Sequence, residues 1–92
     1  MLLKNKKVII VGGSGLIGKK IIKTFLSNGA KVLNLDLKKI LIKNSRYNFK
    51  NFNCSDLNSM NNNFDQIIKK FGVPDIFINS SYPRTQDWSK ND

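Results

Sequence analysis

The first third of the chain passes from a short apolar run to an amphipathic stretch and back. Residues 6–11 (KKVIIV) end in a continuous apolar run, which is typical of a strand buried in a parallel sheet. Residues 15–28 carry apolar positions at helical spacing with lysines opposite them, which predicts a helix. Gly29 is a suitable left-handed stop, and residues 32–36 form the second apolar strand. The apolar stripe of the predicted helix comprises Leu16, Ile17, Ile21, Ile22, Phe25 and Leu26.

The pattern of the remaining residues is weaker but has the same order. We predict a short helix over residues 38–43 and a third strand over residues 48–53. Ser55 is placed to cap a further helix, which Gly72 ends. Residues 75–79 (DIFIN) are the fourth strand, after which we expect no regular element. The apolar positions of the second long helix are Leu57, Met60, Phe64, Ile67, Ile68 and Phe71.

Strands that alternate with helices predict an α/β fold with a parallel sheet. Right-handed crossovers then order the strands 3-2-1-4 in a partial, doubly wound, Rossmann-like sheet. We interpret residues 1–92 as the N-terminal part of such a domain, truncated after the fourth strand. That strand is then an exposed edge, and an exposed apolar edge favours self-association.

The junction between the first strand and the first helix is rich in glycine. Gly12, Gly15 and Gly18 lie three residues apart, with Gly13 as an additional glycine. In a dinucleotide-binding turn, the first glycine permits the sharp turn, the second lets the backbone approach a pyrophosphate, and the third lets the helix pack closely on the sheet. The phosphates would lie against N–H groups at the positive end of the helix. The residues of this turn that we expect to bind the cofactor are Gly12, Ser14, Gly15, Leu16, Ile17 and Gly18.

Asp36 ends the second strand, 18 residues after Gly18. An acidic residue about 20 residues beyond such a turn hydrogen-bonds the ribose hydroxyls of the cofactor. Its charge also repels a 2′-phosphate, so we expect NAD in preference to NADP, although Lys38 and Lys39 offer compensating charge. The alternative is that Asp36 is only a solvated acid at the end of a strand.

Two later segments, residues 55–57 (SDL) and 75–81 (DIFINSS), join the turn and Asp36 in a common pattern. With all four, the chain resembles the short-chain dehydrogenase/reductase family over nearly its whole length. The resemblance implies that an Asp followed by an aliphatic residue contacts the adenine ring and that the end of the fourth strand lies along the cofactor. Further cofactor-binding residues on this basis are Leu37, Ser55, Asp56, Leu57, Asn79, Ser80 and Ser81.

The chain departs from this family in two respects. Val11 stands where the family often has Thr, so a hydroxyl that ties the turn to the sheet is missing. The glycine spacing is that of the extended branch, which includes nucleotide-sugar epimerases and dehydratases, whereas the end of the fourth strand resembles the short branch. Residues 82–84 (YPR) resemble those of sugar-modifying members.

The family's catalytic Ser and Tyr-x-x-x-Lys have no counterpart here. Tyr82 is followed four residues later by Gln86, Tyr47 is followed by Asn51, and the chain contains no His. We therefore assign no catalytic residue and no metal ligand. We interpret the chain as the cofactor-binding part of an NAD(P)-dependent oxidoreductase, and we expect this part to be inactive alone. An epimerase or dehydratase of the extended branch and a non-catalytic NAD(P)-binding regulatory module remain as alternatives.

The net charge of +10 raises the question of nucleic-acid binding. Arg46 and Arg84 are the only arginines, and the lysines are spread along the chain, so we expect no specific nucleic-acid partner. Cys54 is a single cysteine, which suits a reducing compartment, and no apolar run approaches the roughly 18 residues of a membrane span. We expect a cytoplasmic protein with a small-molecule substrate that forms a homo-oligomer at full length.

Overall fold

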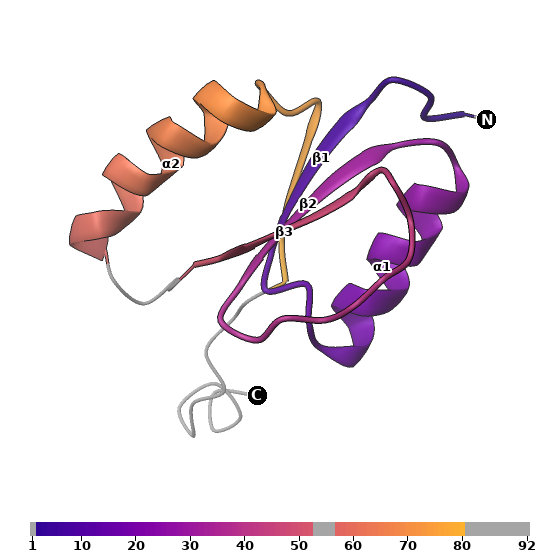
Figure 1. Cartoon of the computed structure of the whole chain (residues 1–92), viewed down its shortest axis with the longest axis horizontal. Helices are drawn as coiled ribbons and strands as arrows, with labels where there is room; N and C mark the ends of the chain where they lie inside the picture. The colour runs from indigo at the N-terminus through magenta and orange to yellow at the C-terminus, as the bar shows by residue number, and fades with distance from the viewer. Residues whose placement is uncertain (1, 53–56, 81–92) are drawn as a thin grey trace, which may run out of the picture.

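The computed structural model describes residues 2–52 and 57–80, which form a single parallel sheet with a helix on each face (Figure 1). The strand order is β3-β2-β1-β4, and all neighbouring strands are parallel. The predicted Rossmann-like α/β fold and its strand order 3-2-1-4 are therefore confirmed. The elements are β1 (Lys7–Val11), α1 (Leu16–Ser27), β2 (Lys31–Asp36), β3 (Tyr47–Asn51), α2 (Leu57–Phe71) and β4 (Ile76–Asn79).

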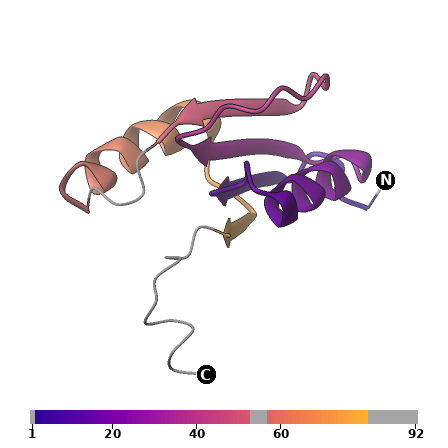
Figure 2. The same ribbon diagram turned by 90° about the horizontal axis from the view of Figure 1, so that it is seen from below.

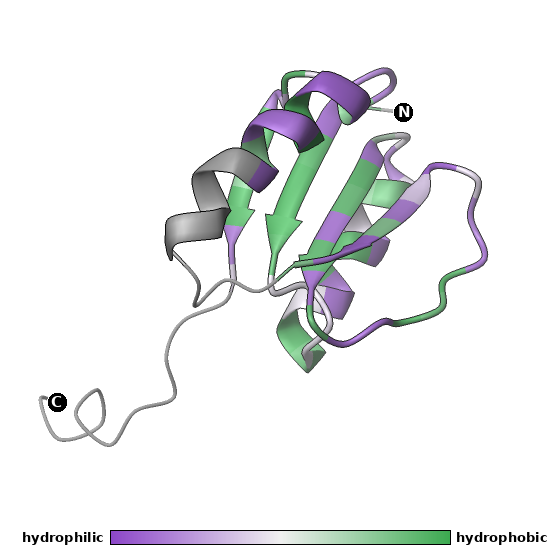
Figure 3. Cartoon of the chain, turned by 60° about the vertical axis from the view of Figure 1, so that its left-hand side comes forward, coloured by the Kyte–Doolittle hydropathy of each residue, from purple (hydrophilic) through white to green (hydrophobic). Residues whose placement is uncertain are grey.

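The alternation of side chains along β1 and β2 divides the core into two layers. Val8, Ile10 and Val32 pack with the inner face of α1. Ile9 and Leu33 face the other way, toward α2. The two helices lie on opposite sides of the sheet (Figure 2), and the hydrophobic residues concentrate on the central strands (Figure 3). Because both faces are covered, β1 is buried along almost its whole length, as its continuous apolar run predicts.

Left-handed glycines end both helices as predicted. Gly29 has a φ of 93° and Gly72 a φ of 105°, values that glycine adopts without strain. The Gly29 N–H donates to the Leu26 carbonyl, which closes the C-terminus of α1. The predicted strand boundaries differ from the observed ones by one or two residues.

The predicted helix over residues 38–43 is wrong, because this segment contains no regular element. Side chains from other elements bind the polar backbone groups that a helix would use. The Lys38 carbonyl accepts the Ser14 hydroxyl, and the Ile40 carbonyl accepts the Tyr47 hydroxyl. Ile40 is buried against the α1 layer, whereas Leu41 is exposed. The segment is therefore held as an irregular connection.

The predicted apolar stripe of α1 is correct only from its second turn onward. Ile22 and Leu26 are buried, but Leu16 and Ile17 are 84% and 66% exposed. The buried residue of the first turn is Gly18, which lies against the backbone of Gly13. Leu16 and Ile17, the two apolar residues before Gly18, are exposed to solvent.

The sheet has β3 at one edge and β4 at the other, and β4 pairs with β1 alone. Phe77 of this strand is 47% exposed, and its ring lies 5.5 Å from that of Phe64 on α2. The predicted apolar edge is thus present in the described part of the chain. No helix among the described residues is long and apolar enough to cross a membrane.

Candidate functional site

The glycine turn between β1 and α1 is fastened to β2 by three successive N–H groups. The Gly12 N–H donates to the Leu35 carbonyl at 2.7 Å. The Gly13 N–H donates to Asn34 Oδ1 at 2.9 Å, and the Ser14 N–H donates to Asp36 Oδ2 at 3.0 Å. A φ of 77° at Gly12 turns the chain sharply out of the strand, as predicted. These three donors are therefore used within the protein.

The next residue, Gly15, differs from its neighbours in having space around it. A Cβ built on Gly15 would meet no atom within 4 Å, and its φ of −78° and ψ of 178° are ordinary extended values. Neither backbone strain nor packing within the described residues requires a glycine here. An unhindered approach to the backbone is what a bound pyrophosphate would require.

Gly15 is also the N-cap of α1, and this cap has no side-chain hydrogen bond. The first helical turn contains no acidic residue. The N–H groups of Leu16 and Ile17, at the start of the helix, have no acceptor within the helix itself. With the helix dipole, they form a site that favours an anion.

Asp36 faces this turn from the end of β2. Its Oδ2 accepts the Ser14 N–H, and its Oδ1 accepts the Lys38 N–H at 3.2 Å. These two bonds hold the carboxylate against the turn, so Asp36 is not a freely solvated side chain. An ionised carboxylate has about four acceptor positions, so Asp36 retains capacity for hydroxyl donors. The next residue, Leu37, is 60% exposed.

The buried polar residue Asn34 was missed by the sequence analysis. It lies two residues before Asp36 on β2 and is fully buried. Its Nδ2 donates to Ser14 Oγ at 3.2 Å and to the Tyr47 hydroxyl at 3.3 Å. The signal available in the sequence was a polar residue inside the apolar segment KVLNLD, which at a buried position must find hydrogen-bond partners.

Ser80, directly after β4, contacts the turn from the other side. Its hydroxyl lies 2.7 Å from the Gly12 carbonyl and 3.1 Å from the Val11 carbonyl, and its N–H donates to the Val11 carbonyl. A hydroxyl link between turn and sheet is therefore present, supplied by Ser80 rather than by the position of Val11. Asn79 is the neighbour of Val11 in the β1–β4 register.

The structure thus brings together three of the predicted groups: the turn, residues 36–37 and residues 79–80. They lie at the carboxyl ends of β1, β2 and β4. The crossover through α1 leads to one side of β1 and the crossover through α2 to the other, on opposite faces of the sheet. This is the topological switch point at which open α/β sheets bind ligands. Ser55, Asp56 and Ser81 lie outside the described residues, and only the backbone of Leu57 is described, as the start of α2.

Tyr47 has a raised pKa, chiefly because burial disfavours its charged form. The hydrogen bond from Asn34 opposes this shift, and the negative charge of Asp36 adds a smaller increase. A raised pKa in the folded state gives a contribution to stability that is complete below the ordinary value of 10.0 and is lost as the pH rises through the folded pKa. We expect the free energy of unfolding to fall in this alkaline range. Urea melts at successive pH values would show a shallower fall for Tyr47→Phe, and equal slopes would contradict the assignment.

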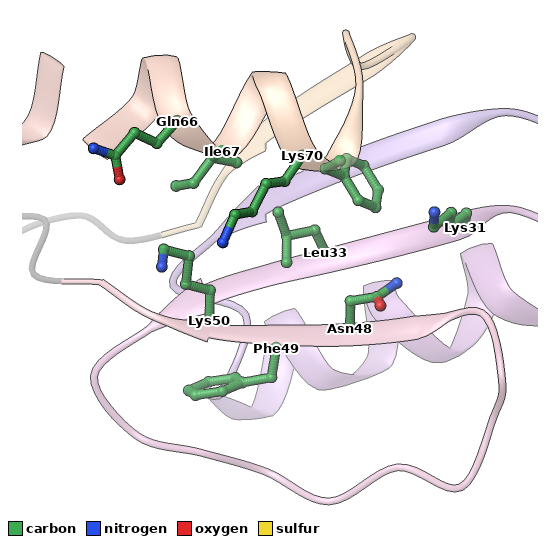
Figure 4. Close-up of a pocket in the computed structure, with 9 residues that line it drawn as sticks. Lys31, Leu33, Asn48, Phe49, Lys50, Gln66, Ile67 and Lys70 are labelled. Carbon is green, nitrogen blue, oxygen red and sulfur yellow. The ribbon is translucent and has the colours of Figure 1, made fainter. Parts of the chain in front are cut away.

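A separate pocket of about 330 Å³ lies between α2 and the strands β2 and β3 (Figure 4). Lys31 and Leu33 face it from the opposite side of β2 to Asn34 and Asp36. None of the predicted cofactor residues lines it, so it is not part of the candidate site. Its lining residues are Lys31, Leu33, Asn48, Phe49, Lys50, Gln66, Ile67, Lys70 and Phe71. Among the described residues, no group of three metal-ligating side chains occurs.

Comparison with known proteins gives a family and several structural neighbours. Residues 8–92 match the model of the NAD dependent epimerase/dehydratase family. The post-translational flagellin modification protein A of Campylobacter coli is 31% identical over 97% of this chain, which covers 39% of that protein. A short chain dehydrogenase from Leptospira borgpetersenii with bound NAD+ has a TM-score of 0.76 and 26% identity, over 97% of this chain and 39% of its own.

A 4-hydroxyisoleucine dehydrogenase complexed with NADH also has a TM-score of 0.76, with 28% identity over 87% of this chain and 35% of its own. The chain therefore spans about two fifths of the length of the Campylobacter coli relative.

Proposed function

This chain belongs to the NAD dependent epimerase/dehydratase family, and we propose that it is the N-terminal, cofactor-binding part of an NAD(P)-dependent oxidoreductase of the short-chain dehydrogenase/reductase type. The observation that carries the proposal is the unhindered backbone at Gly15, beside an uncapped helix N-terminus and one residue after Ser14, whose N–H binds Asp36. Among the residues that the structure describes, no packing or conformational requirement accounts for a glycine at this position. A pyrophosphate against the helix does account for it.

Each part of the site has a role in this proposal. The first-turn N–H groups of α1 bind the pyrophosphate, and the fixed carboxylate of Asp36 accepts hydrogen bonds from the adenosine ribose. When bound, the nicotinamide exchanges a hydride with a hydroxyl or carbonyl carbon of a small-molecule substrate. Asn79 and Ser80 place the end of β4 beside the cofactor. Ser55, Asp56 and Ser81, which lie outside the described residues, are proposed together with Leu57 to have the roles that the family resemblance implies.

The acid–base group of the reaction is proposed to lie beyond residues 1–92. Tyr47 does not fit that role, because its hydroxyl donates to the Ile40 carbonyl and accepts a hydrogen bond from Asn34. Its raised pKa also disfavours proton release near neutrality.

We also propose that the full-length protein forms a homo-oligomer and that it is cytoplasmic. The supporting observation for the location is the single cysteine, Cys54, which suits a reducing compartment.

A second candidate function is epimerisation or dehydration with a recycled hydride. It is favoured by the description of the matching family and by the glycine spacing of the turn. Both functions use the same cofactor site. Assays of the intact protein with NAD distinguish them, since only net oxidation or reduction leaves NADH or NAD+ as a product.

Replacing Asp36 with Ala is expected to weaken NAD binding by about 10- to 100-fold, the value of a charged hydrogen bond of roughly 1.5–3 kcal/mol. It should also raise the relative affinity for NADP, because the repulsion of a 2′-phosphate is lost. Titration calorimetry of the intact protein with both nucleotides measures the two effects.

Asp36→Asn separates these effects, since the amide keeps one oxygen acceptor but removes the charge. Asp65→Ala, at an exposed position on α2, is the matched control. An unchanged NAD affinity and NAD/NADP ratio in Asp36→Ala would show that Asp36 does not contact the ribose.

A further inference from the structure

Asn34 is a fully buried polar side chain whose hydrogen-bonding groups are all used by the candidate site. Its Oδ1 accepts the Gly13 N–H at 2.9 Å. Its Nδ2 donates to Ser14 Oγ and to the Tyr47 hydroxyl, at 3.2 and 3.3 Å. Burying an amide is unfavourable unless such bonds are made. An apolar residue would fill this strand position without that cost, so the bonds themselves are what Asn34 contributes.

Gly13 is the steric counterpart of Asn34. A Cβ on Gly13 would lie 2.5 Å from Asn34 Oδ1 and 2.8 Å from Ile22 Cδ1. Gly13 is not among the glycines with positive φ, so backbone conformation does not demand a glycine there. The additional glycine of the turn is instead needed so that the amide of Asn34 can reach the Gly13 N–H.

The same network extends to the connection after β2. The Ser14 hydroxyl, which accepts from Asn34, donates to the Lys38 carbonyl. The Tyr47 hydroxyl, also bound to Asn34, donates to the Ile40 carbonyl at 3.3 Å. One buried amide therefore connects the glycine turn, β3 and residues 38–40.

Two of these segments, the glycine turn and residues 38–40, also hold the carboxylate of Asp36. The Ser14 N–H binds one of its oxygens and the Lys38 N–H binds the other. Any movement of the turn relative to residues 38–40 would change the direction of the carboxylate. Asn34 contacts the turn directly, and it contacts residues 38–40 through the hydroxyls of Ser14 and Tyr47.

We propose that Asn34 is a positioning residue, which holds the turn and residues 38–40 in the arrangement that binds the adenosine half of the cofactor. This inference rests on the proposed function, because it assumes that Asp36 receives the adenosine ribose. Asn34 does not touch the cofactor itself and acts through Gly13, Ser14 and Tyr47. Removing its amide should therefore weaken binding of the adenosine half while leaving the nicotinamide half unaffected.

The test uses Asn34→Leu in the intact protein, with Asn48→Leu as the matched control. Asn48 is on the neighbouring strand β3, lines the pocket on the α2 face, and makes only long bonds of 3.4 Å. Calorimetry with NAD, adenosine monophosphate and nicotinamide mononucleotide measures the affinity for the whole cofactor and for each half. We expect Asn34→Leu to weaken binding of NAD and adenosine monophosphate by about tenfold, as the loss of hydrogen-bonded positioning implies.

Binding of nicotinamide mononucleotide should stay within twofold of the parent protein in the same variant, and Asn48→Leu should change none of the three affinities. A residue needed only for folding would weaken both halves alike, and that result would overturn the proposal. So would an adenosine monophosphate affinity equal to that of the parent. If Asn34→Leu fails to fold, Tyr47→Phe decides: it removes a single hydroxyl, and a selective loss of adenosine monophosphate affinity supports the proposal, whereas no loss refutes it.

The proposed function fails separately. A parent protein that binds neither NAD nor adenosine monophosphate would refute the cofactor site, and with it the role of Asn34 in binding. In that case, thermal melts still measure the steric coupling between Gly13 and Asn34. Gly13→Ala should lower Tm less in an Asn34→Ala background than in the parent, because one of the two clashes is absent.

Discussion

Replacing Gly18 with Ala is expected to lower the stability of this protein by about 3 kcal/mol, at the upper end of what overpacking usually costs. A Cβ on Gly18 would lie 2.6 Å from Gly13 Cα and 2.8 Å from the Gly13 carbonyl carbon and oxygen. Backbone atoms cannot rotate away as a side chain would, so α1 or the turn must shift. For a domain of this size, the loss corresponds to a fall in Tm of more than about 10 °C.

Gly15→Ala is the matched control for that measurement. It makes the same chemical change three residues earlier, where a Cβ meets no atom within 4 Å. Its Tm should change by less than a quarter of the change at Gly18, apart from the small preference of helix N-caps for glycine over alanine. Equal losses of Tm in the two variants would mean that Gly18 is not a packing contact.

The elements that were predictable from the sequence are those set by strong local patterns. The continuous apolar run of β1, the buried stripe of α1 from Ile22 onward and the stop at Gly29 each follow from periodicity or from one residue's conformational freedom. The strand order then follows from the handedness of the crossovers. In α2, Ile67 and Phe71 are buried as the helical spacing predicts.

The errors arose where contacts between distant residues override local preference. Residues 38–43 have the composition of a short helix, yet Ser14 and Tyr47 bind carbonyls of this segment from elsewhere in the chain. Leu16 continues the apolar period of α1, but the buried residue of the first turn is Gly18, which packs against the backbone of Gly13, and Leu16 is exposed. A pattern of apolar positions contains no information about either contact.

The site shows the same division. The turn and Asp36 were predictable because their spacing reflects the geometry of a strand, a turn and a helix. Asn34 was not, since one polar residue in an apolar strand does not reveal its partners. The hydroxyl of Ser80 was expected near the cofactor, but its bonds to the turn depend on β4 lying next to β1.

Gly15→Val is expected to abolish measurable NAD binding, a loss of at least about 100-fold, because the side chain would occupy the space through which a pyrophosphate approaches the helix. The change should lower Tm only by the amount that the preference of helix N-caps for glycine over valine implies. The backbone at Gly15 has a φ of −78° and a ψ of 178°, an extended conformation that suits a β-branched residue, and no atom of the described chain obstructs its Cβ. The helix begins at the next residue, so the cost in stability is confined to the N-cap position.

Calorimetric titration of the intact protein with NAD, beside thermal melts with and without the nucleotide, separates binding from folding. The parent protein should gain Tm on addition of NAD, and the Gly15→Val variant should not, while without NAD the two should differ only by the cost of the N-cap substitution. Lys23→Val, at an exposed position of the same helix, tests whether a β-branched substitution in α1 has this effect by itself. A Gly15→Val protein with the NAD affinity of the parent would place the pyrophosphate elsewhere. A lowered Tm with unchanged affinity would give Gly15 a structural role that neither its dihedral angles nor its surroundings account for.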